Sequence, residues 1–303
     1  MAFPLSTILH MILMSTEFFL GITVNGYLII MNCTDLFKSR KLKPLEILLL
    51  CIGISRFGLQ LMLMVQIFYS VFFPLAYDET IFNENMMFFW MLFSTISLWF
   101  AAWLALFYCF KISGFTHSSF LWLKFRISKF ILWLLWGSLL ASLGTAATST
   151  MVELPKTEYN DVFRNTTLQR TTANTEKNND LLFVNLMLFL PLSVFVVCTF
   201  MLSISLYRHT HQMQSGPHGF SNVKTEAHIK ALGTIITFFC FFMSYFVAFM
   251  ANMTFRIPYR SNQFFLIKEI MAAFPAGHSL ILIMSNPKLR EPLRRILCFK
   301  KNQ

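Results

Sequence analysis

The chain alternates between long apolar blocks and short polar breaks. Most blocks run for roughly twenty residues or more, which is the length that a helix needs to cross a bilayer core of about 30 Å. Reading the blocks as helices predicts seven membrane spans, at residues 5–31, 45–73, 86–111, 130–151, 181–207, 231–254 and 264–284. The long polar stretch from Glu153 to Asp180 is predicted to be a loop, and residues 285–303 a short basic tail. We therefore expect an all-α bundle of seven transmembrane helices in one domain.

Composition agrees with a chain whose solvent is lipid. Hydrophobic residues make up 56% of the chain and charged residues only 13%, and the mean hydropathy is +0.59. A soluble domain carries about a quarter charged residues. The net charge of +11 raises the question of nucleic acid, but the basic residues lie in short segments between apolar blocks and form no continuous basic face. We expect membrane lipids as partners and no nucleic acid.

The basic residues are unevenly divided between the two sets of helix ends. Seventeen of the 25 Lys and Arg residues fall on the side of the C-terminal tail, and seven fall on the opposite side. Because cytoplasmic loops carry the excess of Lys and Arg, we expect an extracellular N-terminus and a cytoplasmic C-terminus, in a multi-pass protein of the plasma membrane. The Asn165-Thr166-Thr167 triplet would then lie outside, which makes Asn165 a candidate for N-glycosylation.

The cysteines do not suggest a disulfide. All six fall in apolar segments or in segments that we place in the cytoplasm, so no extracellular pair can be assembled from them. Cys298 lies beside Phe299 and two lysines, where it is either a palmitoylation site or a free thiol.

Arg56 is a charged residue inside the second apolar block. A charge at the centre of a membrane helix costs roughly 2.5 to 3.5 kcal/mol on insertion scales, so Arg56 should face the bundle interior and find polar partners there. Asn25, Ser279 and Ser285 are candidates for these partners. Because intramembrane charges usually mark function, we expect Arg56 to act in a conformational equilibrium.

Four of the predicted spans carry motifs in a recognisable order. The second contains Ser55-Arg56, and the third contains Leu98-Trp99 followed by Phe107, Tyr108 and Lys111. The fifth ends in Arg208-His209, and the seventh contains His278-Ser279 and then Asn286-Pro287-Lys288-Leu289. Together these motifs resemble the bitter taste receptor family, the type 2 taste receptors, and the resemblance covers all seven spans. It implies a G-protein-coupled receptor that detects bitter small molecules.

The sequence departs from the family pattern at three positions. Gly233 stands where a lysine usually follows Ala-Leu, Ser118 where a proline often follows the histidine, and Ala276 where a serine precedes Gly-His-Ser. Gly233 removes a cation from the cytoplasmic end of the sixth span, where a G protein would dock. We expect it to affect basal activity or coupling strength.

The third span offers one face suited to a ligand. Trp90, Ser94 and Ser97 follow i, i+4 and i+7 spacing, which places them together on a helix. The family resemblance implies a pocket on this stretch, with the candidate ligand-binding residues Gln66, Trp90, Ser94, Ser97, Phe183, Met187, Tyr245, Lys268 and Met271. Lys268 could pair with Glu269 or Glu17, extend to the membrane interface, or meet an anionic ligand.

Signal transfer would use a second set of residues. The candidates for the conformational switch and for G-protein coupling are Asn25, Arg56, Phe107, Tyr108, Lys111, Arg208, His209, His228, His278 and Ser279. The resemblance implies a gustducin-type heterotrimeric G protein, phospholipase C and calcium release as the downstream pathway.

Other functions fit the sequence less well. It contains no H-E-x-x-H, Gly-rich phosphate loop or G-x-S-x-G, so we expect no enzyme, cofactor or metal site. A different seven-helix chemosensory receptor would share the topology, but no Asp-Arg-Tyr follows the third span. A secondary transporter is the alternative from another class, although no inverted repeat is visible. The identity of the agonists, and homo- or hetero-oligomer formation, are left open.

Overall fold

The computed structural model describes residues 4–39, 43–77, 80–112, 118–153, 167–214, 222–255, 257–258 and 261–299. These residues form helices and no strand. The helices are α1 (Leu5–Ser39), α2 (Pro44–Phe72), α3 (Pro74–Tyr77), α4 (Thr80–Ile112), α5 (Ser118–Glu153), α6 (Thr167–Gln214), α7 (Asn222–Thr254), α8 (Asn262–Ser285) and α9 (Pro287–Phe299). Seven of them, α1, α2 and α4 to α8, are long and apolar enough to cross a membrane. The structure confirms the predicted all-α, seven-helix bundle.

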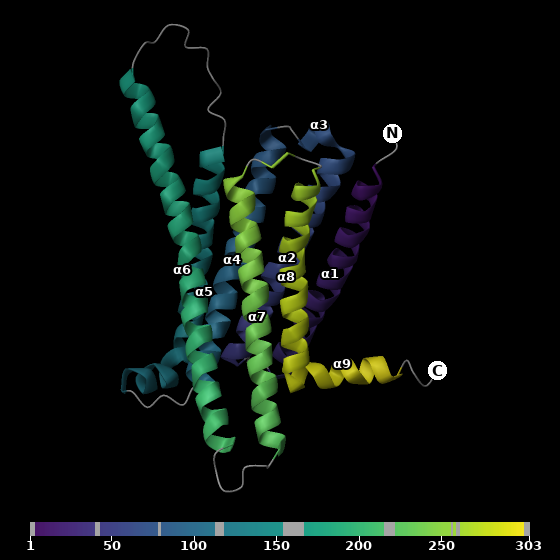
Figure 1. Cartoon of the computed structure of the whole chain (residues 1–303), viewed down its shortest axis with the longest axis vertical. Helices are drawn as coiled ribbons and strands as arrows, with labels where there is room; N and C mark the ends of the chain where they lie inside the picture. The colour runs from purple at the N-terminus through teal and green to yellow at the C-terminus, as the bar shows by residue number, and fades with distance from the viewer. Residues whose placement is uncertain are drawn as a thin grey trace.

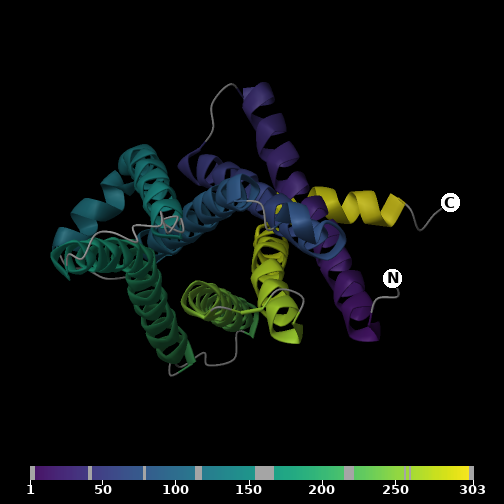
Figure 2. The same ribbon diagram turned by 90° about the horizontal axis from the view of Figure 1, so that it is seen from above.

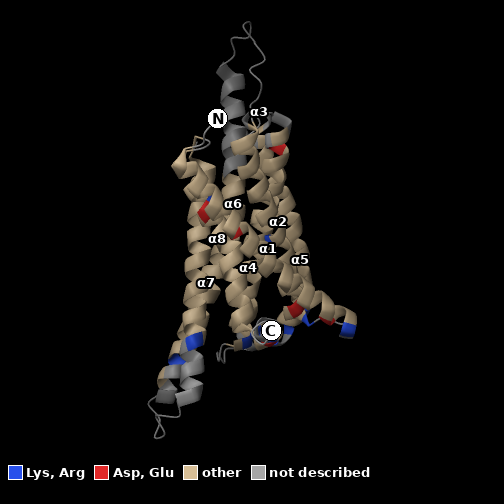
Figure 3. Ribbon diagram, turned by 90° about the vertical axis from the view of Figure 1, so that its right-hand side faces the viewer, with Lys and Arg blue, Asp and Glu red and all other residues tan. Residues whose placement is uncertain are grey.

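The long helices run side by side along one axis (Figure 1). Helix α4 packs against α2, α5 and α6, whereas α8 packs between α1 and α7. The chain begins at one end of this bundle, and α9 lies across the other end and extends outward from it (Figures 1 and 2). We call these the N-terminal end and the α9 end. Lys and Arg gather at the α9 end, as Figure 3 shows.

Two segments differ from the sequence-based expectation. Helix α6 begins at Thr167, inside the stretch that we predicted to be a loop. That part of the stretch contains no Gly or Pro, so a helix can continue through it although its residues are polar. The predicted basic tail is also largely helical, as α9. Pro287 is its first residue, a position that tolerates proline, and the Asn286 side chain accepts a hydrogen bond from the Lys288 backbone N–H at 3.1 Å.

The bundle interior has two main apolar clusters with a polar layer between them. The first cluster includes Leu59 of α2 and Phe274 of α8, and the second, toward the α9 end, includes Ile52 and Leu282 of the same two helices. The buried polar residues Arg56 and His278, together with Ser279, fall between these positions in sequence on both helices. The fold therefore holds a charged side chain at mid-bundle, where packed apolar layers separate it from water.

A groove lies on the outer face of α1 and α2. Its volume is about 540 Å³ and its lining is almost entirely apolar, including Ile8, Met11, Phe19 and Phe72. Several of these side chains are exposed on the bundle surface, so the groove opens away from the interior. It is separate from the buried face of α4 on which we predicted a ligand pocket.

Candidate ligand pocket and polar switch

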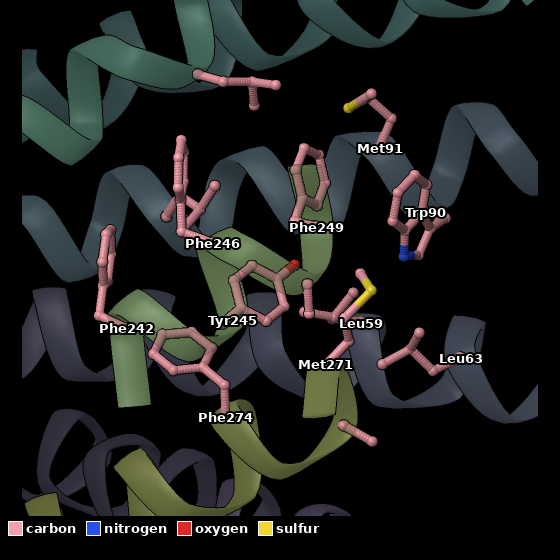
Figure 4. Close-up of a cluster of buried hydrophobic side chains, with 14 of the residues drawn as sticks. Leu59, Leu63, Trp90, Met91, Phe242, Tyr245, Phe246, Phe249, Met271 and Phe274 are labelled. Carbon is pink, nitrogen blue, oxygen red and sulfur yellow. The ribbon is translucent and has the colours of Figure 1, made fainter. Parts of the chain in front are cut away.

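Trp90, Tyr245 and Met271 converge from three different helices. Each of these side chains is completely buried, on α4, α7 and α8 respectively. Figure 4 shows them around a common centre, with Leu59 and Leu63 of α2 beside them. The Trp90 ring stacks on Phe249 with a centroid distance of 5.1 Å. The fold thus gathers residues of four helices that lie far apart in the sequence.

Several polar atoms in and around this centre have no hydrogen-bond partner among the described residues. They are Gln66 Oε1, Trp90 Nε1 and Ser97 Oγ, all buried. The buried hydroxyls of Ser94 and Tyr245 are close enough to pair with each other. Buried polar groups are normally paired, and each exception calls for a water, an ion or a ligand. Apolar walls with a few polar groups are also the usual composition of a small-molecule site.

Lys268 lies against the same centre. Only 1% of its surface is exposed, and its Nζ lies 5.0 Å from the centroid of the Trp90 ring and 5.5 Å from that of Phe264. The side chain therefore does not extend to the membrane interface, one of the options that we considered. The neighbouring Glu269 forms an ion pair with His10 of α1, at 2.7 Å. Lys268 places a positive charge over aromatic faces beside the polar atoms of α4.

The remaining ligand-binding candidates are placed less uniformly. Met271 belongs to the buried cluster, and the Gln66 side-chain amide donates to the Tyr77 hydroxyl at 3.4 Å. On α6, Phe183 is exposed and Met187 is only partly buried. Among the described residues, these two are not part of the apolar cluster that surrounds Trp90.

A polar network connects α1, α2 and α8 at mid-bundle. The Nη1 group of Arg56 donates to Ser279 Oγ at 2.9 Å and to His278 Nδ1 at 2.9 Å. Ser279 in turn donates to Asn25 Oδ1 at 2.7 Å, and the Asn25 amide donates to the Pro275 carbonyl at 3.2 Å. Arginine has no acceptor, so His278 Nδ1 must accept and the imidazole is neutral, with its proton on Nε2.

The predicted partners of Arg56 are therefore placed in three different ways. Ser279 contacts the guanidinium directly, and Asn25 reaches it through Ser279. Ser285 lies exposed at the end of α8 and belongs to a different layer, so the expectation that it would meet Arg56 was wrong. His278, which we had treated as part of the switch, is the second direct partner.

Asn25, Arg56, His278 and Ser279 belong to this mid-bundle network, and four other candidates of the same set lie toward the α9 end of the bundle. Phe107 is buried and Tyr108 partly buried, whereas Lys111 and Arg208 are exposed. The Nζ of Lys111 lies 5.9 Å from the Phe107 ring centroid. The side chains of His209, His228 and Cys298 fall outside the described residues, as does Asn165.

Sequence reasoning missed four contacts that hold this architecture together. They are the His10–Glu269 pair, the hydrogen bond from the Tyr27 hydroxyl to the Leu289 carbonyl at 2.7 Å, and the bonds of Lys288 to Asp35 and Glu46. The partners are more than 200 residues apart in each case. Only Lys288 gave a signal in advance, because it is the cation of the Asn-Pro-Lys-Leu motif.

Comparison with known proteins gives one consistent result. Residues 1–301 match the family model described as Taste receptor protein (TAS2R). The chain is 62% identical to the human Taste receptor type 2 member 2 over 301 residues, which is 99% of each chain. It is 34% identical to Taste receptor type 2 member 7 of Papio hamadryas, over 93% of this chain and 90% of that receptor. It is 33% identical to Taste receptor type 2 member 1 of Chlorocebus aethiops, over 97% of each.

These matches decide between the readings that the sequence had left open. They span essentially the whole chain, including all seven membrane helices, and they exclude a transporter or another class of chemosensory receptor. Taste receptors are not enzymes, in agreement with the absence of catalytic motifs. The chain belongs to the type 2 taste receptor family and is a multi-pass, G-protein-coupled bitter taste receptor.

Proposed function

We propose that bitter small molecules bind among α2, α4, α7 and α8, against Trp90, Ser94, Ser97, Tyr245, Lys268 and Met271. The observation that carries this proposal is the set of buried, unpaired polar atoms within aromatic walls. A ligand with one or two acceptors could pair with the Trp90 indole N–H and the Tyr245 hydroxyl while its apolar surface replaces contacts between side chains. Lys268 would favour acidic or hydrogen-bond-accepting compounds over amines.

Phe274 connects this pocket to the polar network. Its ring lies 4.8 Å from the Tyr245 ring and 5.4 Å from the His278 ring, measured between centroids. The Arg56 guanidinium carbon lies 4.9 Å from the same ring. A ligand that shifts Tyr245 would therefore press on a side chain that also contacts Arg56 and His278.

The proposed mechanism is a population shift. An agonist moves the equilibrium only by the difference between its affinities for the active and inactive arrangements. The network of Arg56, Ser279 and Asn25 joins three helices, so an altered ring packing at Phe274 would change how α1, α2 and α8 sit on one another.

The α9 end is proposed to face the cytoplasm of a cell whose plasma membrane holds the receptor. Its excess of Lys and Arg supports this orientation. Tyr108, Lys111 and Arg208 then lie on the side where a gustducin-type G protein would bind and activate phospholipase C. Asn165 would lie outside the cell, where it can be glycosylated, and the exposed apolar helix faces would contact lipid.

Calcium imaging tests the pocket directly. Cells would co-express the receptor with a gustducin-type G protein and be exposed to a panel of bitter compounds. Trp90→Phe removes only the indole N–H and part of the ring, and Tyr245→Phe removes only the hydroxyl. We expect each to raise the half-maximal concentration of some agonists by about tenfold, the effect of losing one hydrogen bond of about 1.4 kcal/mol.

Trp136→Phe provides the matched control. Trp136 lies on α5 with 66% of its surface exposed, away from the proposed pocket. Its substitution should leave every dose–response curve unchanged at equal surface expression. Unchanged curves for both pocket variants across all active compounds would rule out the pocket, and responses that persist without the gustducin-type subunit would rule out the proposed partner.

A further inference from the structure

The side chain of Arg56 uses only part of its hydrogen-bonding capacity. Both N–H groups of Nη1 have acceptors, in His278 and Ser279. Nε and Nη2 are buried and have no hydrogen-bond partner among the described residues. Three of the five N–H groups of the guanidinium are therefore unpaired. The whole residue has no exposed surface.

The unpaired nitrogens form one edge of the guanidinium. Nε–H and one N–H of Nη2 point in parallel, and this pair is the fork that holds an acceptor in a bidentate arrangement. An edge of this kind is usually filled by a carboxylate. Among the described residues, Arg56 makes no ion pair with any carboxylate, and its two direct partners are a hydroxyl and a neutral imidazole.

Two carboxylates of the described helices, Glu17 and Glu269, lie toward the N-terminal end from this layer. Glu17 precedes Asn25 by eight residues, roughly 12 Å along α1, and its Oε2 has no hydrogen-bond partner among the described residues. On α8, Glu269 precedes His278 by nine residues, which is roughly 13 Å along a helix, and its carboxylate is bound to His10. Arg56 itself is twelve residues into α2, roughly 18 Å from its start, and is farther still from its end, so both ends of the helix are distant from the guanidinium. Among the described residues, the positive charge has no carboxylate at its own level.

A permanently charged guanidinium in this position needs a mobile counter-ion. Removing an unpaired charge from water carries a desolvation cost of several kcal/mol, and an arginine does not escape it by losing its proton. Phe274 lies against one face of the guanidinium and Arg56 has no exposed surface, so a counter-ion at this edge would have to be small. Tyr245 of α7 is fully buried beside the same layer, with its ring 4.8 Å from that of Phe274 between centroids.

We propose that the Nε/Nη2 edge of Arg56 binds a small monovalent anion, chloride, at mid-bundle. The anion would accept from Nε–H and Nη2–H and neutralise the charge that His278 and Ser279 leave uncompensated. It would stabilise the receptor arrangement in which α2 and α8 are joined through Arg56.

Thermal unfolding of the full-length receptor in lipid nanodiscs tests this site. The salt would be changed from sodium gluconate to sodium chloride at constant ionic strength, so that screening is the same throughout. We expect the unfolding midpoint to rise with chloride along a saturating curve, as it does for a ligand that binds only the folded state. Bromide should raise the unfolding midpoint as chloride does. Equal midpoints in gluconate and chloride would overturn the proposal and assign the unpaired edge to water.

Two variants separate a site at Arg56 from a general salt effect. Arg56→Gln should abolish the difference between chloride and gluconate. Lys268→Gln removes another buried cation and should keep the difference between chloride and gluconate. A difference that survives in Arg56→Gln would overturn the proposal. Should Arg56→Gln fail to fold, crystals of the unaltered receptor grown in bromide decide the matter: an anomalous peak within hydrogen-bond reach of Nε and Nη2 supports the site, and its absence refutes it.

Discussion

Lys288 Nζ lies 2.8 Å from Asp35 Oδ2, and this contact joins the first turn of α9 to the last turns of α1. The same ammonium bonds Glu46 of α2 at 2.5 Å, and Glu46 also accepts from the Lys43 backbone N–H. One cation thus ties together three helix ends. The Asn-Pro-Lys-Leu motif has a structural explanation here, because Asn286 caps α9, Lys288 holds the two carboxylates and Leu289 is buried.

Replacing Lys288 with alanine should loosen α9 and leave the bundle folded. Its side chain is 49% exposed, so each ion pair is screened by water and contributes only about 0.2 to 1 kcal/mol. We expect faster amide hydrogen exchange in α9 and a small decrease in the free energy of unfolding. Arg294→Ala is the control, because the ion pair of Arg294 among the described residues is with Glu291 of its own helix, at 3.9 Å. Equal rates of amide hydrogen exchange in both variants would show that Lys288 does not stabilise α9.

The effect of Lys288 should not depend on pH near neutrality. Hydrogen bonds to Asp35 and then Glu46 raise the pKa of Lys288 above its ordinary value of 10.5. A pKa that is higher in the folded state gives stabilisation that is complete below the unfolded value and is lost as the pH rises through the folded value. The stability difference between the unaltered receptor and Lys288→Ala should be constant from about pH 6 to pH 8 and disappear only above about pH 10.5. A difference that disappears between pH 6 and pH 8 would contradict this assignment.

His278→Ala should destabilise the receptor more than His278→Asn does. Alanine leaves one Nη1 donor of Arg56 without an acceptor, at a cost of about 1 to 3 kcal/mol, whereas asparagine still offers a carbonyl oxygen. Both variants lose the stacking of His278 on Phe238, at 4.2 Å between centroids, so their difference isolates the hydrogen bond. Thermal unfolding of the purified variants measures this difference in stability. Indistinguishable unfolding midpoints would argue that His278 Nδ1 does not accept a hydrogen bond from Arg56.

Lys268→Met should weaken anionic agonists selectively. Methionine keeps most of the length and apolar volume but removes the charge that lies over the Trp90 ring. Losing a charge-assisted hydrogen bond of about 1.5 to 3 kcal/mol lowers potency by roughly ten- to a hundredfold. Neutral agonists serve as the internal control in the same calcium assay. Equal losses for neutral and anionic compounds would indicate a packing effect instead.

Gly58 of α2 and Gly26 of α1 form a matched pair for testing helix packing. A Cβ on Gly58 would lie 2.5 Å from Phe93 Cε1 of α4, whereas one on Gly26 would meet nothing within 4 Å. Gly58→Ala should therefore cost about 1 to 3 kcal/mol, and Gly26→Ala should be neutral or slightly stabilising. Chemical unfolding of both variants compares them, and similar stabilities would mean that Phe93 moves aside freely.

Sequence reasoning predicted most of the architecture and part of the site, for identifiable reasons. Apolar length alone predicts a span, and a charge such as Arg56 within a span must face inward, so its burial and its contact with Ser279 followed from energetics. The pairing of His10 with Glu269 could not be predicted in this way, because it depends on α1 lying beside α8. The helix at Thr167–Asp180 was missed because polarity was taken to indicate a loop, although polar residues without Gly or Pro also form helices outside a membrane.

Pro275 makes α8 flexible at one point along its length. Proline has no N–H, so the carbonyl of Met271 loses its usual partner one turn away, and the helix is softest between these two residues. Lys268 and Met271 lie before this point, and His278 and Ser279 lie after it. The carbonyl of Pro275 is held by Asn25 of α1. The ligand-facing half of α8 can therefore tilt about a joint anchored to α1, so that a small displacement at the pocket becomes a change of angle at the polar network.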